Sequence, residues 1–138
     1  SIFDYVASLK DGIPSIKKMG TDMSVPEEHN REMMAYYDEV LKGYGLEYVI
    51  FGHMGNCHPH VEIILKDMED LSKAKEAYSI LAKRAFELGG SPSAEHGIGK
   101  LKRDYIGMVY GEEGISQTRR VKSAFDPNNI LNRGNIVE

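Results

Sequence analysis

The stretch 46-LEYVIFGHMGNCHPHVEIIL-65 decides the fold of this chain. Residues Leu46–Gly52 are rich in β-branched and aromatic side chains, which predicts a strand that ends at a histidine-containing loop. His58–Leu65 alternates polar and apolar residues, as a strand with one buried face does. Because successive side chains of a strand point to opposite faces, the apolar set is expected to face the core. The other face then carries a polar stripe of His58, His60 and Glu62.

A helix is expected on each side of this stretch. Upstream, a short strand over Gly20–Pro26 leads to a helix that Pro26 opens and Gly43 closes. Downstream, either Asp67 or Asp70 caps a long helix that stops at a pair of glycines. The two predicted strands of the opening stretch therefore lie between two predicted helices.

The rest of the chain predicts one more strand and further helices. The strand is expected over Ser91–Glu95, and helical stretches follow at about Lys100–Tyr110 and Glu112–Ala124. The resulting order, β-α-β-β-α-β, predicts an α+β fold with a ferredoxin-like split βαβ sheet and additional C-terminal helices. No repeat, linker or low-complexity tract interrupts the sequence, so residues 1–138 are expected to form a single domain.

The composition excludes some classes of function. The 138 residues carry a formal net charge of −4, which argues against a nucleic-acid surface, because such a surface needs clustered Lys and Arg. Cys57 is the one cysteine, so no intrachain disulfide is expected and a reducing compartment is the default. We recognise neither an apolar run that could span a bilayer nor a signal peptide. A cytoplasmic protein is therefore expected.

The histidines indicate chemistry rather than packing. Four of the five fall in two glycine-punctuated segments, one running from His53 to His60 and the other containing Glu95-His96. Imidazole and carboxylate are ligands of zinc, iron and manganese, so His53, His60 and Glu95 are candidate metal ligands. Three protein ligands would leave a coordination position open for a substrate oxygen. In a strand the adjacent Glu95 and His96 cannot aim at one point, which suggests different roles unless Gly97 turns the chain sharply.

Each candidate also has a plainer interpretation. A single histidine outside such a cluster is commonly a surface residue, and His29 is interpreted in this way. His58 and Glu62 are either additional ligands or substrate contacts, or polar neighbours that touch no metal. Cys57 is most simply a small buried side chain, with thiolate ligation as the alternative. His53 is expected to fold back onto the polar stripe through turns at neighbouring glycines.

Three blocks of the sequence occur in an informative order: Gly52-His53-x-Gly55…His60, then Ser93-Ala94-Glu95-His96-Gly97-Ile98-Gly99-Lys100, then Asp126-Pro127-Asn128-Asn129-Ile130-Leu131-Asn132. They resemble the C-terminal domain of the FAD-linked oxidases, the family of D-lactate dehydrogenase and the glycolate oxidase flavin subunit. The usual family patterns are Gly-His-x-Gly-Asp-Gly-Asn-x-His, Gly-Glu-His-Gly-Ile-Gly and Asp-Pro-x-x-Ile-Leu-Asn-Pro-Gly-Lys. The segment Asp22–Pro26 also resembles the family's Asp-Val-x-Val-Pro strand entrance.

The chain departs from the family pattern at three places. Asn56-Cys57-His58 stands where the family has Asp-Gly-Asn, Glu62 stands where it usually has Asn, and Arg133-Gly134-Asn135 stands where it has Pro-Gly-Lys. The candidate metal ligands and His96 match without change. The first two departures place additional donors, His58 and Glu62, next to the matched histidines.

The resemblance implies the substrate- and metal-binding cap of a flavin-dependent 2-hydroxy acid dehydrogenase or oxidase of the D-lactate or glycolate type, with hydride transfer to FAD. It implies that His53, His60 and Glu95 hold a divalent metal, with zinc favoured over iron and manganese. It also implies that His96 takes the hydroxyl proton of the substrate as general base. The family carries FAD on a separate N-terminal domain, which these residues do not supply, so the isolated chain is expected to be inactive.

The partners that the resemblance implies are a 2-hydroxy acid and the N-terminal FAD-binding domain. A homo-oligomer would be one way to cover an exposed apolar face, and peripheral membrane association of the full protein stays open. Two other classes stay open as well. A metal-dependent hydrolase would use Glu62 as its base and need no flavin. A non-catalytic metal-binding α+β domain would fill every coordination position, with His58 or Cys57 as a fourth ligand.

Overall fold

The structure is a computed structural model that describes residues 18–137 of the chain. The chain divides into two compact units, Ser1–Pro92 and Ser93–Glu138, each with its own secondary structure. The expectation of a single domain over residues 1–138 stays a prediction. Within the described residues, no helix combines the length and the apolar character needed to cross a membrane.

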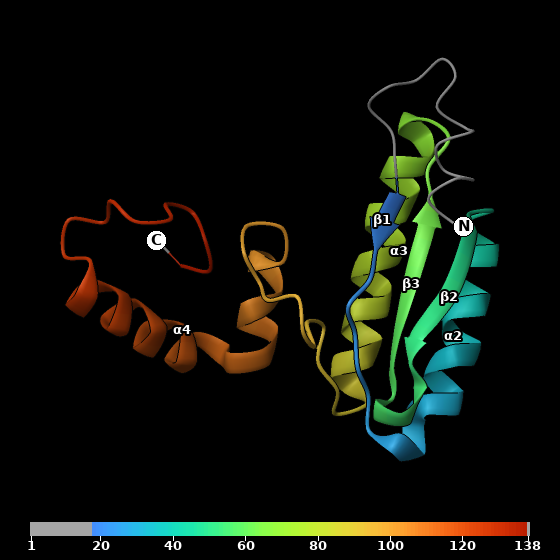
Figure 1. Ribbon diagram of the computed structural model, residues 1–138, viewed down its shortest axis with the longest axis horizontal. Helices are drawn as coiled ribbons and strands as arrows, with labels where there is room; N and C mark the ends of the chain where they lie inside the picture. Colours follow the sequence, from blue (N-terminus) through green and yellow to red (C-terminus); the bar gives the residue numbers. More distant parts are fainter. Residues whose placement is uncertain (1–17, 138) are drawn as a thin grey trace. The chain divides into compact units, whose positions relative to one another are not determined.

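The first unit is built on a three-stranded antiparallel sheet (Figure 1). Strands β2 (Glu47–His53) and β3 (His58–Ile64) form the hairpin that the opening stretch predicts, joined by a 3-10 turn over Met54–Asn56. Strand β1 (Lys18–Gly20) pairs with the other edge of β3, so the order across the sheet is β1-β3-β2. The central strand is therefore β3, which carries two of the candidate histidines.

A fourth strand is reduced to one bridge. Ser24 and Ser91 exchange two backbone hydrogen bonds, with N···O distances of 3.0 and 2.9 Å. The strand expected over Ser91–Glu95 does not continue, because Pro92 has no N–H to donate to a ladder. The order of elements and the antiparallel pairing are those of a split βαβ sheet, so the predicted α+β fold is confirmed.

Two helices cover one face of this sheet (Figure 1). Helix α2 (Asn30–Gly43) follows a 3-10 turn over Glu27–His29 and ends at the predicted glycine. Helix α3 (Met68–Glu87) begins after Asp67, whose side chain accepts a hydrogen bond from the Asp70 N–H at 2.8 Å. This bond satisfies one of the backbone donors that a helix start leaves without an internal partner.

The core lies between these helices and the sheet. Val61 and Ile63 of β3 are fully buried, as the alternating pattern predicts. The helices contribute the buried side chains Met33, Tyr37, Leu41, Ala74, Ala77, Leu81, Ala82 and Ala85. With its helix-facing side packed in this way, the sheet has its opposite face left for polar residues.

The second unit is mainly helical. After a 3-10 turn over Arg103–Tyr105, helix α4 (Ile106–Phe125) changes direction at Gly111, whose φ of 63° and ψ of −177° are not helical. This break separates the two helical stretches expected from the sequence, because a left-handed φ is a conformation that glycine adopts without steric cost. The chain then turns at Asp126, which leads the third block of the family pattern.

Candidate metal site

Strand pairing brings three histidines to one face of the sheet. His58 and His60 lie two residues apart on β3, so their side chains share a face. In the β2–β3 register, His53 is paired with His58 and Phe51 with His60. Directly paired residues project to the same side, and this is the side that Val61 and Ile63 do not face. The polar stripe predicted on β3 is therefore present.

The three imidazole rings are close neighbours. The ring centroids of His58 and His60 are 4.6 Å apart, those of His53 and His60 are 5.5 Å apart, and those of His53 and His58 are 6.0 Å apart. His53 reaches the stripe through its place in the β2–β3 ladder, and Gly55 lies in the turn that joins the two strands. His53 is exposed, His60 is half-buried and His58 is buried, which makes the stripe less open than predicted.

The sequence did not indicate Asp22 as a donor, but the structure places it beside the histidines. The β1–β3 register pairs Gly20 with Glu62, so two residues further along the chain Asp22 comes level with His60. One carboxylate oxygen of Asp22 lies 3.0 Å from Nε2 of His58, and both residues are buried. The likeness of Asp22–Pro26 to a family segment was the one signal in the sequence that pointed to this residue.

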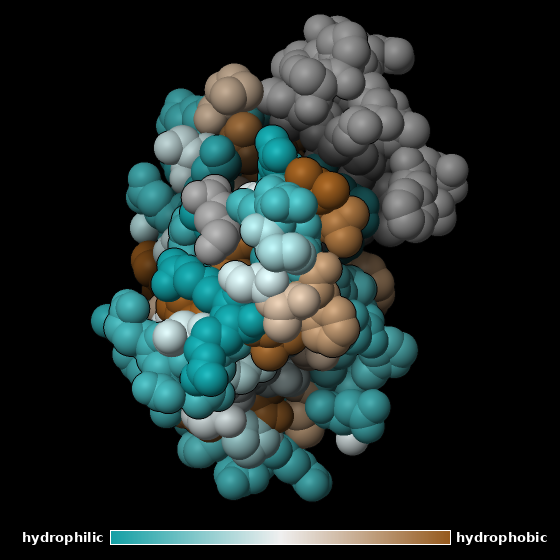
Figure 2. Space-filling model, turned by 90° about the vertical axis from the view of Figure 1, so that its left-hand side faces the viewer, coloured by the Kyte–Doolittle hydropathy of each residue, from teal (hydrophilic) through white to brown (hydrophobic). Residues whose placement is uncertain are grey.

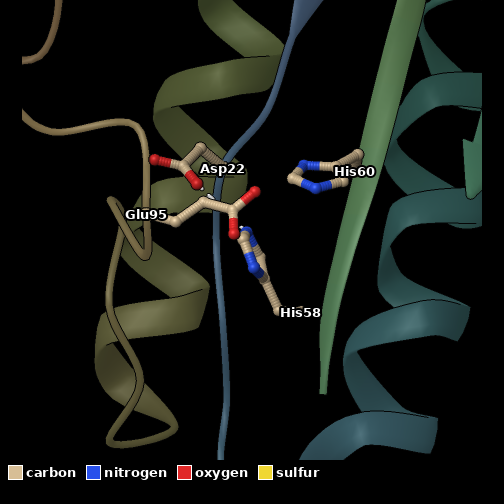
Figure 3. Close-up of side chains that lie close together, drawn as sticks. All are labelled: Asp22, His58, His60 and Glu95. Carbon is tan, nitrogen blue, oxygen red and sulfur yellow. Dashed lines mark hydrogen bonds and ion pairs between the residues drawn. The ribbon is translucent and has the colours of Figure 1, made fainter. Parts of the chain in front are cut away.

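Asp22, His58 and His60 form a compact group of possible ligands within the first unit. One donor atom from each lies within 4.8 Å of the donor atoms of the other two. Figure 3 draws these three side chains with Glu95, which belongs to the second unit. Imidazole nitrogen with carboxylate oxygen is a donor set that zinc, iron and manganese accept, so the residues present fit a divalent metal.

The absence of a side chain at Gly52 lets the His60 ring on β3 lie close to the backbone of β2. A Cβ atom at position 52 would lie 2.9 Å from Cδ2 of the His60 ring and 2.9 Å from the His60 backbone nitrogen. Gly52 also has a φ of 123°, which side-chain-bearing residues rarely adopt. The glycine of the Gly-His block therefore has a steric role next to the candidate ligand.

Glu62 continues the polar stripe but is engaged in an ion pair. Its Oε1 lies 2.6 Å from the Lys18 ammonium on β1, and its side chain is 12 % exposed. Tyr37 is a buried side chain of α2. Burial raises its pKa to about 12, and the negative charge of Asp22 shifts the pKa in the same direction. Because that phenol stays protonated across the physiological range, Tyr37 offers no base to the site.

Within the second unit, Glu95 and His96 lie on a bent segment rather than on a strand. Glu95 Oε1 is 3.3 Å from His96 Nε2, so the two side chains lie side by side rather than on opposite faces of a strand. Gly97 has a φ of 73°, the sharp turn that was the stated exception. Ser93 stabilises the bend. Its hydroxyl donates a hydrogen bond to the Gly97 carbonyl at 2.9 Å and accepts one from the Lys102 ammonium at 3.0 Å.

The spacing and grouping of these residues agree with the comparison to known sequences. The chain matches the family described as FAD linked oxidases, C-terminal domain, over residues 11–136. It belongs to this family. The match covers both histidine-bearing strands and the segment with Glu95 and His96.

Several curated proteins are similar to this FAD-linked oxidase domain. The glycolate oxidase subunit GlcD of Bacillus subtilis is 32% identical over 117 residues, which cover 83% of this chain and 25% of that protein. The D-2-hydroxyglutarate dehydrogenase of Escherichia coli is 34% identical over 126 residues, or 83% of this chain and 11% of that protein. The mitochondrial D-lactate dehydrogenase [cytochrome] of Kluyveromyces lactis is 33% identical over 118 residues, or 86% and 20%. The chain thus spans a quarter or less of the length of these relatives.

The third family block has a structural role in this domain. Asp126 is buried, and its two carboxylate oxygens accept hydrogen bonds from the Ile130 and Leu131 N–H groups, both at 2.9 Å. Lys122 of α4 donates to the same carboxylate at 2.7 Å. The lysine and the Ile130 N–H lower the pKa of Asp126 to about 2. The aspartate therefore stabilises the turn after α4.

Proposed function

We propose that this chain is the substrate- and metal-binding cap of a flavin-dependent 2-hydroxy acid dehydrogenase of the D-lactate or glycolate type. The observation that carries the proposal is the convergence of His53, His58 and His60 on one sheet face. The names of the relatives support the substrate class, since each specifies a 2-hydroxy acid: glycolate, D-2-hydroxyglutarate or D-lactate. Such a cap would act together with an FAD-binding domain that these residues do not include.

The proposed metal ligands are His53 and His60 from the first unit and Glu95 from the second. Glu95 is proposed as the third ligand because it matches the glutamate of the family's Gly-Glu-His-Gly-Ile-Gly block, while His53 and His60 match the Gly-His-x-Gly…His block.

The residues of this chain would bind the substrate and move one proton. When bound, the metal supplies a Lewis acid that favours ionisation of the substrate hydroxyl, with zinc preferred and iron or manganese as alternatives. FAD on the separate domain supplies the hydride acceptor. His96, whose Nε2 lies 3.3 Å from a carboxylate oxygen of Glu95, would accept the hydroxyl proton at a ring nitrogen.

The proposal is tested by ligand binding to the metal-loaded chain. Calorimetric titration with D-lactate and glycolate should show binding that disappears after chelation and in His60→Ala. Propionate, which has the carboxylate of lactate but lacks the 2-hydroxyl, should bind at least ten times more weakly. His29→Ala, which alters an exposed histidine paired with Glu32, is the matched control and should bind as wild type does. Equal affinities for lactate and propionate, or an affinity for lactate that does not change after chelation of the metal, would contradict the proposal.

One alternative has a specific observation in its favour. His58 and Asp22 are both buried, as ligands of a structural metal usually are. A non-catalytic metal-binding domain would then lose its fold on chelation, whereas a catalytic site usually leaves the fold intact. Thermal melts followed by circular dichroism with and without chelator separate the two. A metal-dependent hydrolase is less well supported, because its proposed base, Glu62, is paired with Lys18.

The proposed setting is a cytoplasmic protein in which the FAD-binding domain is the principal partner. Self-association of the isolated cap is the second expected interaction, because the described part of the second unit exposes several large apolar side chains. These are Leu101, Tyr110, Val121, Phe125, Ile130 and Leu131. Figure 2 shows apolar patches among hydrophilic side chains at the surface. Sedimentation of the purified chain over a range of concentrations measures the self-association, and a concentration-independent monomer would contradict it.

A further inference from the structure

We propose that Asp22 and His58 are direct ligands of the metal held on this sheet face, in addition to the histidines that the family pattern supplies. This inference rests on the proposed function, because it presumes a divalent ion at the site. It concerns two side chains of the first unit. The structure, and not the sequence, places Asp22 beside the histidines. His58 stands where the usual family pattern has Asn.

The positions of both residues are fixed by backbone hydrogen bonds. On one side of Asp22, the Thr21 N–H donates to the Val61 carbonyl at 2.8 Å, and the Thr21 hydroxyl accepts from the Val61 N–H at 3.2 Å. On the other side, Ser24 is held by its two bonds to Ser91. His58 belongs to β3 and is paired across the ladder with His53. The imidazole is therefore presented by strand β3, and the carboxylate by a segment that backbone hydrogen bonds hold on both sides.

Burial makes a bound cation favourable at this place. Asp22 is 1% exposed and His58 is 6% exposed. A carboxylate removed from water in this way is stable only beside positive charge or strong hydrogen-bond donors. A divalent ion supplies that charge, and an adjacent imidazole can share it as a second ligand. The pair is thus better matched to a cation than to a neutral substrate group.

The separations agree with ligation of a common ion. With Asp22 and His58 added to His53, His60 and Glu95, the ion would have five protein ligands and an octahedral sixth position for the substrate oxygen, and neighbouring ligands of an octahedral ion at about 2.1 Å lie about 3.0 Å from each other. The Asp22 oxygen and His58 Nε2 are 3.0 Å apart, and the donor atoms of these residues and His60 lie within 4.8 Å of one another. Small side-chain rotations would bring all three onto one ion.

The first test measures the zinc affinity of the full chain after its metal has been removed. Titration against a chromophoric chelator should give a Kd for His58→Asn and for Asp22→Asn that exceeds the wild-type value by more than the about 10- to 100-fold that loss of a residue outside the coordination sphere costs. His58→Asn restores the residue usual in the family, so it is the variant expected to fold normally. His29→Asn is the matched control and should leave the Kd unchanged. Far-ultraviolet circular dichroism verifies the fold of each variant.

A second measurement distinguishes a ligand from a side chain that only positions one. In a Cys57→Ser background, His58→Cys loaded with Co²⁺ should show a thiolate-to-metal charge-transfer band, which requires residue 58 to touch the ion. The Cys57→Ser parent should lack that band. A wild-type Kd in His58→Asn, or the absence of the band in His58→Cys, would overturn the inference. If zinc still depends on His53, His60 and Glu95 in that case, the proposed function stands without it. If Asp22 and His58 hold zinc but no 2-hydroxy acid binds, the proposed function fails while this inference stands.

Discussion

The two units of this chain differ in how they are stabilised. All but two of the buried apolar side chains in the described residues belong to the first unit, where two helices pack on a sheet; the exceptions are Ile106 and Val137. The second unit instead exposes large apolar residues, including Phe125 at 85% and Leu101 at 95%. Its clearest stabilising feature is polar, the Asp126 carboxylate that holds the turn after α4.

The difference indicates what each unit contributes. A packed core holds its strands in fixed positions, and the histidine face of the first unit needs that precision for metal binding. The second unit carries Glu95 and His96 on a bend held by a few hydrogen bonds. We therefore expect substitutions in the core of the first unit to lower the free energy of unfolding strongly. Substitutions in the second unit should change only the structure around the altered residue. Four predictions test this contrast.

The largest effect is expected from a cavity in the first unit. Leu81→Ala removes a fully buried side chain of α3 and should lower the free energy of unfolding by about 2–5 kcal/mol. Phe125→Ala in the second unit should change it by less than about 0.5 kcal/mol, because that side chain is already exposed. Urea denaturation followed by circular dichroism measures both. Comparable losses in the two variants would contradict the contrast between the units.

Gly52→Ala should have the next largest effect. The added methyl group would collide with the His60 ring and backbone at 2.9 Å and would force a residue with a side chain to keep a φ of 123°. A loss of about 1–3 kcal/mol in the free energy of unfolding is expected, together with weaker zinc binding. Gly55→Ala is the control, since nothing lies within 4 Å of a Cβ atom there. A Gly52→Ala variant with wild-type stability and zinc affinity would show that the His60 ring does not need the space that Gly52 leaves on β2.

Asp67→Ala should cost about 1 kcal/mol, because it removes the acceptor that caps the N–H of Asp70 at the start of α3. Asp67→Asn keeps an acceptor at that position and should remain close to wild type. Thermal melts of the three proteins provide the comparison. If both variants lose the same stability, charge rather than the capping bond is responsible.

The smallest effect on global stability is expected at Asp126, where the consequence is local. Because the folded pKa of about 2 lies below the unfolded value near 4, its stabilisation is complete above pH 4 and is lost as the pH falls toward 2. In wild type, the amide resonances of Ile130 and Leu131 should titrate with a midpoint near 2. In Asp126→Asn that titration should be absent, while the melting of the first unit changes little. A midpoint near 4 in wild type would show that the carboxylate is not held by these donors.

Much of the first unit could be predicted from the sequence, because its signals are local. The alternation in β3, the cap at Asp67 and the stop at Gly43 are properties of short segments, and the structure confirms each. The Ser91–Glu95 strand was wrong because a favourable pattern was interrupted by one residue without an N–H, Pro92.

The site was harder to predict, because its geometry depends on pairing between distant strands. The proximity of His53 to His58 follows from the hairpin register, so the sequence could indicate it. Asp22 lies 36 residues before His58 and meets it through the β1–β3 register, which no local pattern encodes. The roles assigned to His96 and Glu95 stay predictions, since they depend on chemistry that the fold alone does not establish.

The most direct test of metal binding is the anomalous scattering of zinc-loaded crystals of the full chain, recorded above and below the zinc absorption edge. One peak is predicted on the histidine-bearing face of the β2–β3 hairpin, at about 2.0–2.1 Å from nitrogens of His53 and His60. A carboxylate oxygen of Asp22 and a ring nitrogen of His58 should lie at similar distances. Crystals that bind no zinc at this face, or bind it only at exposed side chains elsewhere, would contradict the metal-site assignment and the mechanism built on it.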